Sequence, residues 1–278
     1  MQLARSMLKI LILLLSFKIT LGQESNDSLR KYGYDSLKKY SYLVSGIIND
    51  HSAVIGTGFF IKKNASVYFI TAAHVVTGWN ALEKKWNKDD PDTFFVKLTD
   101  KATGEDVLCS IDVSASKKRL VPFSIWDKPD IFIYKIKKPS SYIINSIENL
   151  IVDSPANYVN EINKVFGYGF ASYTHFSDFH SLINFVPTVI DASTVMKYDS
   201  IPNSRKNGLP DSMHFMIAPT FPWENNFGNG ASGAPIFIYS EKLERFIFAG
   251  VVIAINRKGM FDLVLRFQKF WEFFNAKR

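Results

Sequence analysis

The sequence predicts an all-β protein, either a barrel or a sandwich, because short apolar runs recur along most of the chain. Turn-forming clusters of Gly, Pro, Asn, Asp and Lys separate these runs, a pattern typical of many short strands. With 278 residues, 47% of them hydrophobic, the chain is long enough for a large core in one large or two small domains. The clearest predicted strands are Phe94–Leu98, Val107–Val113, Ile131–Ile136, Lys164–Phe170 and Phe246–Asn256.

The N-terminus has the pattern of a secretory signal peptide over residues 1–22. Arg5 and Lys9 precede the apolar run Ile10–Phe17, and Gly22 supplies a small residue at the expected cleavage site. A membrane anchor is the alternative, but the run is much shorter than the ~20 residues that a span requires. We therefore expect export to the periplasm or the extracellular space, with no stable membrane insertion after cleavage.

Residues 23–44 form a polar lead-in with several tyrosines. Asn26-Asp27-Ser28 is suited to cap a short helix that continues through Lys39.

A β-hairpin is predicted where two β-prone runs, Gly56–Ile61 and Val67–Thr71, flank the polar turn Lys62–Ser66. The second run leads into two alanines and then His74. Small residues at that point let another part of the chain approach the imidazole closely. A single histidine at a strand end is usually structural, so this pattern does not by itself predict function.

Asp130 begins the apolar run Ile131–Ile136. A buried carboxylate requires a partner, and an imidazole N–H is a suitable one. Asp127 is the alternative, but Asp130 adjoins the apolar run directly.

The segment Gly230–Pro235 places one serine, Ser232, in a tight turn with almost no other side chains. Such a turn leaves backbone N–H groups free to point at a ligand oxygen, as acyl transfer through a serine requires. A glycine-rich turn between two strands is the simpler interpretation of this segment alone.

Together these segments resemble the chymotrypsin/trypsin-like serine protease family, especially its disulfide-poor bacterial members. The family's TAAHV pattern stands at Thr71–Val75, its DIALLK-type strand at Asp130–Lys135 and its GxSGxP turn at Gly230–Pro235. The order His, Asp, Ser is that of the chymotrypsin triad. The resemblance spans most of residues 42–276 and implies two antiparallel β-barrels with a C-terminal helix.

The resemblance also implies a secreted serine endopeptidase that hydrolyses peptide bonds in a peptide or protein substrate. His74 would act as general base and acid, Asp130 would orient it, and Ser232 would be the nucleophile. The backbone N–H groups of Gly230 and Ser232 would form the oxyanion hole. No cofactor and no metal are implied.

The best boundary between the two barrels falls within residues 138–160, around Pro139 and Pro155. We expect a first barrel over 45–145, against which the lead-in packs, and a second barrel with the C-terminal helix over 146–278. His74 and Asp130 would belong to the first and Ser232 to the second. The predicted helix, Leu265–Lys277, presents Phe267, Phe270, Trp271 and Phe274 on one face.

Two departures from animal trypsins bear on activation and specificity. Ala231 replaces the aspartate that pairs with the new N-terminus after zymogen cleavage, so we expect no activation by that route. Asn226, near the base of the expected substrate pocket, would not select Lys or Arg by charge. Gly250, Val251 and Val252 would form the wall that pairs with an extended substrate, which favours small or medium apolar side chains.

Charge and cysteine content exclude several other classes of function. The formal charge of +7 includes three basic residues within 1–22 and no acids there, which leaves +4 on the mature chain. Lys and Arg are scattered, which argues against nucleic-acid binding. Cys109 is the only cysteine, so no internal disulfide is possible, and we expect it to be a small buried apolar residue. His175 and His180 flank Asp178, but we expect a loop there rather than a metal site.

Two other functions are compatible with parts of this pattern. A non-catalytic relative that binds peptides or proteins would share the fold, although such relatives usually lose a triad residue. A lipase or esterase would favour a different triad order and a Gly-x-Ser-x-Gly turn. In this chain Ala234 stands in place of the closing glycine of that turn.

Overall fold

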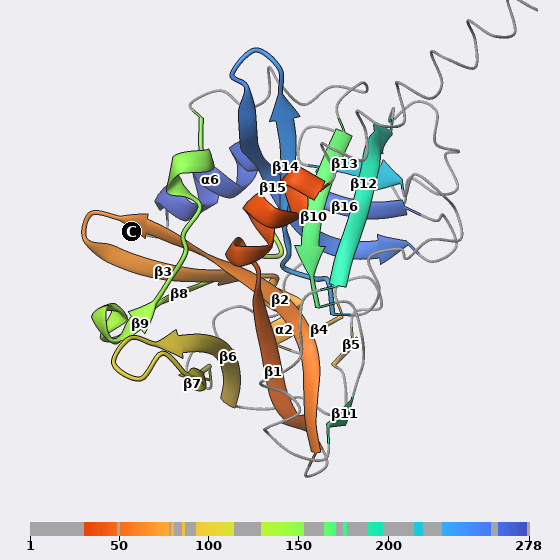
Figure 1. The fold of residues 1–278 in the computed structure, drawn as a ribbon. Coiled ribbons are helices and arrows are strands. Elements are labelled where there is room, and N and C mark those ends of the chain that lie inside the picture. The colour runs from red at the N-terminus through yellow and green to blue at the C-terminus, as the bar shows by residue number, and fades with distance from the viewer. Residues whose placement is uncertain are drawn as a thin grey trace, which may run out of the picture. The chain divides into compact units, whose positions relative to one another are not determined.

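Antiparallel β-strands make up most of the described structure and are followed by a C-terminal helix, which confirms the all-β prediction (Figure 1). The chain separates into two units, Met1–Ser36 and Leu37–Arg278, and all the strands belong to the second. The computed structural model describes residues 31–48, 51–77, 79–80, 85–86, 93–113, 129–152, 164–170, 175–176, 188–196, 214–218, 230–256 and 261–276. The predicted signal peptide lies outside these residues.

The short helix predicted in the lead-in is confirmed at its C-terminal end. Residues 31–37 are helical and continue into the 3₁₀-helix η1 (Lys38–Tyr40). The expected cap at residues 26–28 lies outside the described residues.

A curled antiparallel sheet, called the first sheet below, is built around the long strand β2. Its strand order is β7-β6-β1-β2-β3-β8, and β9 and β11 pair with β6 and β2. The strands are β1 (Tyr42–Ile48), β2 (His51–Lys63), β3 (Ser66–Thr71), β6 (Thr93–Asp100), β7 (Asp106–Asp112), β8 (Phe132–Lys135), β9 (Tyr142–Ile143) and β11 (His175–Phe176).

Shorter elements connect these strands. The helix α2 (Ala73–Thr77) follows β3, and β4 (Trp79–Asn80) pairs with β5 (Lys85–Trp86). The 3₁₀-helices η2 (Pro139–Ser141) and η3 (Glu148–Leu150) follow β8.

The predicted hairpin is confirmed as β2 and β3, which pair from Gly58 opposite Thr71 to Lys63 opposite Ser66. Its turn is shorter than the sequence indicates, because β2 extends to Lys63 and only Asn64 and Ala65 lie between the strands. Both have positive φ, 48° and 59°, as a two-residue turn between twisted strands requires.

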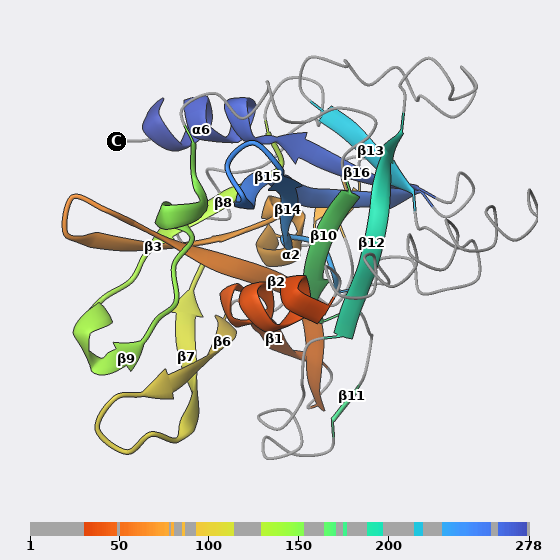
Figure 2. The same ribbon diagram turned by 45° about the horizontal axis from the view of Figure 1, so that its top comes forward.

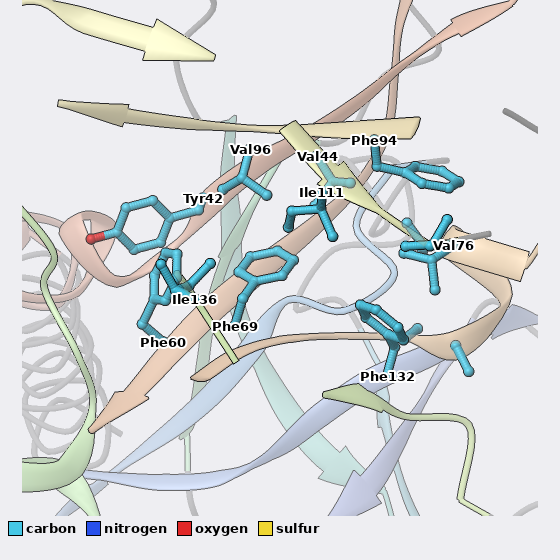
Figure 3. Packing of buried hydrophobic residues seen from close by; sticks show 14 of the residues in the cluster. Tyr42, Val44, Phe60, Phe69, Val76, Phe94, Val96, Ile111, Phe132 and Ile136 are labelled. Carbon is cyan, nitrogen blue, oxygen red and sulfur yellow. The ribbon is translucent and has the colours of Figure 1, made fainter. Parts of the chain in front are cut away.

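One apolar core lies under the first sheet and draws side chains from β1, β2, β3, β6, β7 and β8. Rings and branched side chains converge there (Figure 3), with Phe60 packed against both Tyr42 and Phe69 at centroid distances of 4.6 and 5.1 Å. The members labelled in Figure 3 are Tyr42, Val44, Phe60, Phe69, Val76, Phe94, Val96, Ile111, Phe132 and Ile136.

A second antiparallel sheet closes into a barrel in the order β10-β12-β13-β16-β15-β14. Small and branched residues fill its core, among them Ala231, Ala234, Ile236, Val252 and Val264. The strands are β10 (Lys164–Gly169), β12 (Thr188–Met196), β13 (His214–Ala218), β14 (Pro235–Ser240), β15 (Arg245–Asn256) and β16 (Phe261–Arg266).

The predicted C-terminal helix is confirmed as α6 (Phe267–Ala276), which packs on β15 and β16 (Figure 2). It begins two residues later than the sequence indicates, because Leu265 and Arg266 continue β16. Three of the four predicted face residues, Phe267, Phe270 and Phe274, are buried. Phe270 also lies 6.0 Å, centroid to centroid, from Phe59 of β2, so the helix contacts both sheets.

The end of the lead-in contacts the second sheet as well as entering the first. The Ser41 hydroxyl donates a buried hydrogen bond of 2.6 Å to the carbonyl of Tyr168 in β10. The ring of Tyr40 lies 6.2 Å from that of Phe237 in β14. The sequence predicts packing of this segment on the first barrel, and the structure adds these contacts with the second sheet. No helix in the described part of the chain is long and apolar enough to cross a membrane.

Candidate active site

The pairing of β3 with β8 brings together two residues that are far apart in the sequence. Thr71, the last residue of β3, lies opposite Phe132, the first residue of β8. The chain therefore leaves β3 toward His74 at the same end of the sheet where it enters β8 from Asp130. His74 lies in the first turn of α2 and Asp130 lies two residues before β8, so neither belongs to a strand.

His74 and Asp130 form a hydrogen-bonded pair at this sheet end. The imidazole Nδ1 lies 2.6 Å from Oδ2 of Asp130, and the backbone N–H of His74 donates to Oδ1 at 2.9 Å. The backbone N–H of Ala73 donates to the carbonyl oxygen of Asp130 at 3.2 Å. The contact predicted for Asp130 is present, whereas its rival Asp127 lies outside the described residues.

The two members of the pair differ in exposure. The side chain of Asp130 is 3% exposed and that of His74 is 29% exposed. Because an ionised carboxylate only accepts hydrogen bonds, Asp130 favours the tautomer with the proton on Nδ1. The lone pair of the imidazole is then on Nε2, the nitrogen that does not contact Asp130.

The pKa of the His74 imidazole is raised above its ordinary value of 6.5. Burial by itself lowers this pKa, but the negative charge of Asp130 and its hydrogen bond to the ring together outweigh the burial. The pair therefore stabilises a positive charge on His74 when the imidazole takes up a proton.

The Ser232 turn, defined here as Gly230–Ala234, is shaped by its backbone. Gly230 and Gly233 have positive φ, 98° and 89°, and the N–H of Ala234 donates to the carbonyl of Ala231 at 2.9 Å. A side chain at Gly233 would collide with the Thr57 carbonyl and the Thr71 hydroxyl, so only glycine fits there. Ser232 itself is half-buried.

The Ser232 turn lies against β2, next to the helix that carries His74. The N–H of Thr57 donates to the carbonyl of Ser232 at 2.9 Å. A Cβ placed on Gly56 would lie 3.3 Å from the same carbonyl oxygen and 2.6 Å from Cγ1 of Val75, the residue after His74. Gly56 of β2 is therefore close both to the Ser232 turn and to α2, the helix that carries His74.

The two predicted oxyanion donors, the backbone N–H groups of Gly230 and Ser232, both belong to the described Ser232 turn. Neither the N–H of Gly230 nor that of Ser232 donates to a backbone carbonyl of any residue that the structure describes. Two other N–H groups of the turn do have backbone acceptors, since Gly233 donates to the carbonyl of Val252 at 2.8 Å and Ala234 donates to the carbonyl of Ala231 at 2.9 Å.

The predicted substrate-binding residues have different placements. Gly250, Val251 and Val252 lie in β15 and are fully buried, and the Val252 side chain belongs to the barrel core. Val252 contacts the site through its backbone, which accepts from Gly233 at 2.8 Å and donates to Ala234 at 3.0 Å. Asn226 lies outside the described residues.

The remaining predicted positions carry no site in the described structure. Cys109 is half-buried rather than buried as expected, because it lies in β7 at the margin of the core under the first sheet. His175 lies in β11, opposite Ala53, while Asp178 and His180 lie outside the described residues. Among the residues that the structure describes, no group of three acidic, histidine or cysteine side chains is arranged to hold a metal ion.

Two buried threonines at the site have no predicted role in the sequence. Thr57 bonds to the Ser232 turn through both its backbone and its side chain, and the Thr71 hydroxyl donates to the carbonyl of Thr57 at 2.7 Å. Their signal in the sequence is a hydroxyl residue between two glycines and another before the alanines that precede His74. Only their tertiary contacts distinguish them from ordinary strand residues.

Comparison with known proteins assigns no family to the chain. No protein-family model matches it, and a search of curated proteins finds no match.

Proposed function

We propose that the chain is a serine endopeptidase that hydrolyses peptide bonds through Ser232, His74 and Asp130. The observation that carries the proposal is the His74–Asp130 pair beside the Ser232 turn. A buried carboxylate bonded to both the ring and the backbone of one histidine fixes its orientation. A half-exposed serine lies on a side-chain-poor turn that is bonded to Thr57, directly after Gly56, which is close to the helix that carries His74.

The proposed chemistry assigns one task to each group. Nε2 of His74 takes the proton from Ser232 Oγ as that oxygen attacks the scissile carbonyl, and it returns the proton to the leaving amine. Asp130 stabilises the imidazolium that forms, which agrees in direction with the raised pKa of His74. The N–H groups of Gly230 and Ser232 receive the negative charge on the carbonyl oxygen.

We also propose that the first sheet, like the second, closes into a barrel, and that it does so between β7 and β8. These strands form the two ends of the described strand order, and both send side chains into the same core, Ile111 from β7 and Phe132 from β8. An experimental structure with β7 and β8 joined by ladder hydrogen bonds would support closure, and one with solvent between them would exclude it.

Export of the mature protein is part of the proposal and rests on the sequence of residues 1–22. The N-terminal residue of protein recovered from outside the cytoplasm is expected to be Gln23. Retention of Met1 in that fraction would contradict the predicted cleavage.

The test of the activity is hydrolysis of a folded protein substrate by the purified mature chain. The wild type is expected to cleave the substrate, and Ser232→Ala is expected to remove the cleavage. Ser110→Ala, at an exposed position of β7, is the matched serine control and is expected to retain it. Equal cleavage by Ser232→Ala and the wild type would contradict the role of Ser232 as the nucleophile. A folded but inactive wild type would contradict the proposed activity and favour a peptide-binding relative.

A further inference from the structure

Thr57 of β2 is fully buried, and its hydroxyl makes two hydrogen bonds to segments remote in the sequence. Oγ1 donates to the carbonyl of Gly230 at 2.8 Å and accepts from the N–H of Phe170, directly after β10, at 2.9 Å. The donor and one acceptor position of the hydroxyl are therefore both in use.

The backbone of the same residue adds two further bonds. Its N–H donates to the carbonyl of Ser232, and its carbonyl accepts from the hydroxyl of Thr71, which is also fully buried. Thr57 thus joins β2, the end of β3, the end of β10 and the Ser232 turn.

These contacts hold the Ser232 turn at two carbonyl groups. The carbonyl of Gly230 belongs to the peptide plane that joins Gly230 to Ala231, and the carbonyl of Ser232 belongs to the plane after the serine. With both planes fixed from Thr57, the intervening N–H of Ser232 and the Cα that carries its side chain have little freedom to rotate. Gly230 has a φ of 98°, and a glycine can adopt many other backbone conformations. The hydrogen bond from Thr57 to its carbonyl therefore helps to hold it in this one.

We infer that Thr57 is a positioning residue that aligns Ser232 and the oxyanion donors through its hydroxyl. This inference rests on the proposed function. Thr57 does not contact the reacting atoms, so its effect is exerted through the Gly230 carbonyl and the Phe170 N–H.

The hydroxyl can be removed without changing the shape of the side chain. Thr57→Val replaces it with a methyl group and leaves the Gly230 carbonyl and the Phe170 N–H buried without their partner. Thr57→Ser keeps the hydroxyl and loses only a methyl group. Ser41→Ala is the matched control, because Ser41 also donates a buried bond to a backbone carbonyl of the second sheet but does not touch the Ser232 turn.

The experiment measures kcat and KM on a peptide substrate, together with hydrogen exchange of the backbone amides in Gly230–Ser240. Thr57→Val is expected to lower kcat by about 10- to 100-fold with little change in KM, the size of effect that a small misplacement of reacting groups produces. It is also expected to speed exchange in the Ser232 turn. Thr57→Ser is expected to restore both readouts, and Ser41→Ala is expected to leave both at the wild-type level.

A Thr57→Val variant with wild-type kcat and wild-type exchange would overturn the inference while leaving the protease proposal intact. If the wild type is inactive, the protease proposal fails, and unchanged exchange in Thr57→Val would then still refute the positioning role. Thr57→Cys, with a weaker donor of similar size, serves if the valine variant does not fold, and an unchanged kcat and exchange rate in it would likewise overturn the inference.

Discussion

The two halves of the candidate site are held in place by different means. On the first sheet, two side chains carry the arrangement, since Asp130 binds both the ring and the backbone N–H of His74. On the barrel, the arrangement is carried by backbone, since the Ser232 turn depends on glycines of positive φ and on hydrogen bonds to main-chain groups. Substitutions at the His74–Asp130 pair should therefore impair the chemistry, whereas substitutions in the Ser232 turn should impair the folding of that turn.

The same contrast appears in the residues of positive φ. Asn64 and Ala65 have this conformation in an exposed hairpin turn, where the space around them is open to solvent. Gly233 has a positive φ in an enclosed turn, where an added Cβ atom would lie 2.9 Å from the backbone nitrogen of Ala72. The hairpin turn at Asn64 and Ala65 can therefore shift to relieve backbone strain, whereas the Ser232 turn cannot.

The largest expected effect is on the side-chain half of the site. Asp130→Asn keeps the shape of the carboxylate but favours the wrong tautomer of His74, and kcat is expected to fall by about 10⁴-fold. Steady-state kinetics on a peptide substrate measure this, with thermal unfolding to establish that the variant is folded. Asp106→Asn, which removes an ion pair with Lys97 at 3.0 Å between β7 and β6, is the control and should leave kcat unchanged. A loss of less than about tenfold in Asp130→Asn would show that Asp130 does not orient His74.

The next effect is on the stability of the backbone half. Gly233→Ala forces a methyl group against the Thr57 carbonyl and strains a positive φ, so we expect a loss of about 3 kcal/mol or more in unfolding free energy. Gly104 also has a positive φ, 74°, but a Cβ added there would lie in open space. Gly104→Ala is therefore expected to lower the unfolding free energy by only about 1 kcal/mol. Urea unfolding of the two variants compares them directly, and equal losses would mean that the Ser232 turn is not enclosed.

The pH dependence of hydrolysis follows from the raised pKa of His74. A general base must be neutral, so kcat/KM is expected to rise with pH through a midpoint above 6.5, the ordinary value for histidine. Stability has the opposite sign, because the protonated pair contributes fully below pH 6.5 and its contribution is lost as the pH rises through the folded-state pKa. Rate profiles of the wild type and Asp130→Asn give both midpoints. The variant's midpoint should be lower, and a wild-type midpoint below 6.5 would contradict the electrostatic role of Asp130.

The smallest expected effect lies in the exposed hairpin turn. Ala65→Gly removes the strain of a side chain at a φ of 59°, and a gain of about 0.5 kcal/mol in unfolding free energy is expected, without a change in kcat. Chemical unfolding measures the gain. A clear loss of stability would indicate that the Ala65 methyl group makes contacts that outweigh its strain.

The sequence anticipates the side-chain half of the site better than the backbone half. His74 and Asp130 stand out because a polar residue beside an apolar run needs a partner. Six of the seven predicted strands, all except Gly56–Ile61, are found within two residues of their expected bounds. The roles of Thr57 and Thr71 are not visible, because a threonine in a strand has the same sequence pattern whether or not it bonds to a distant turn. The contact of the lead-in with β10 and β14 depends on tertiary packing in the same way.

The most direct test of the central claim is labelling of the mature protein with a fluorophosphonate, followed by mass spectrometry to locate the adduct. An activated serine is expected to give a single adduct on Ser232, which His74→Ala and Ser232→Ala both abolish while the folded state is kept. Absence of an adduct from the folded wild type, or an adduct that survives in Ser232→Ala, would contradict the assignment of Ser232 as the nucleophile.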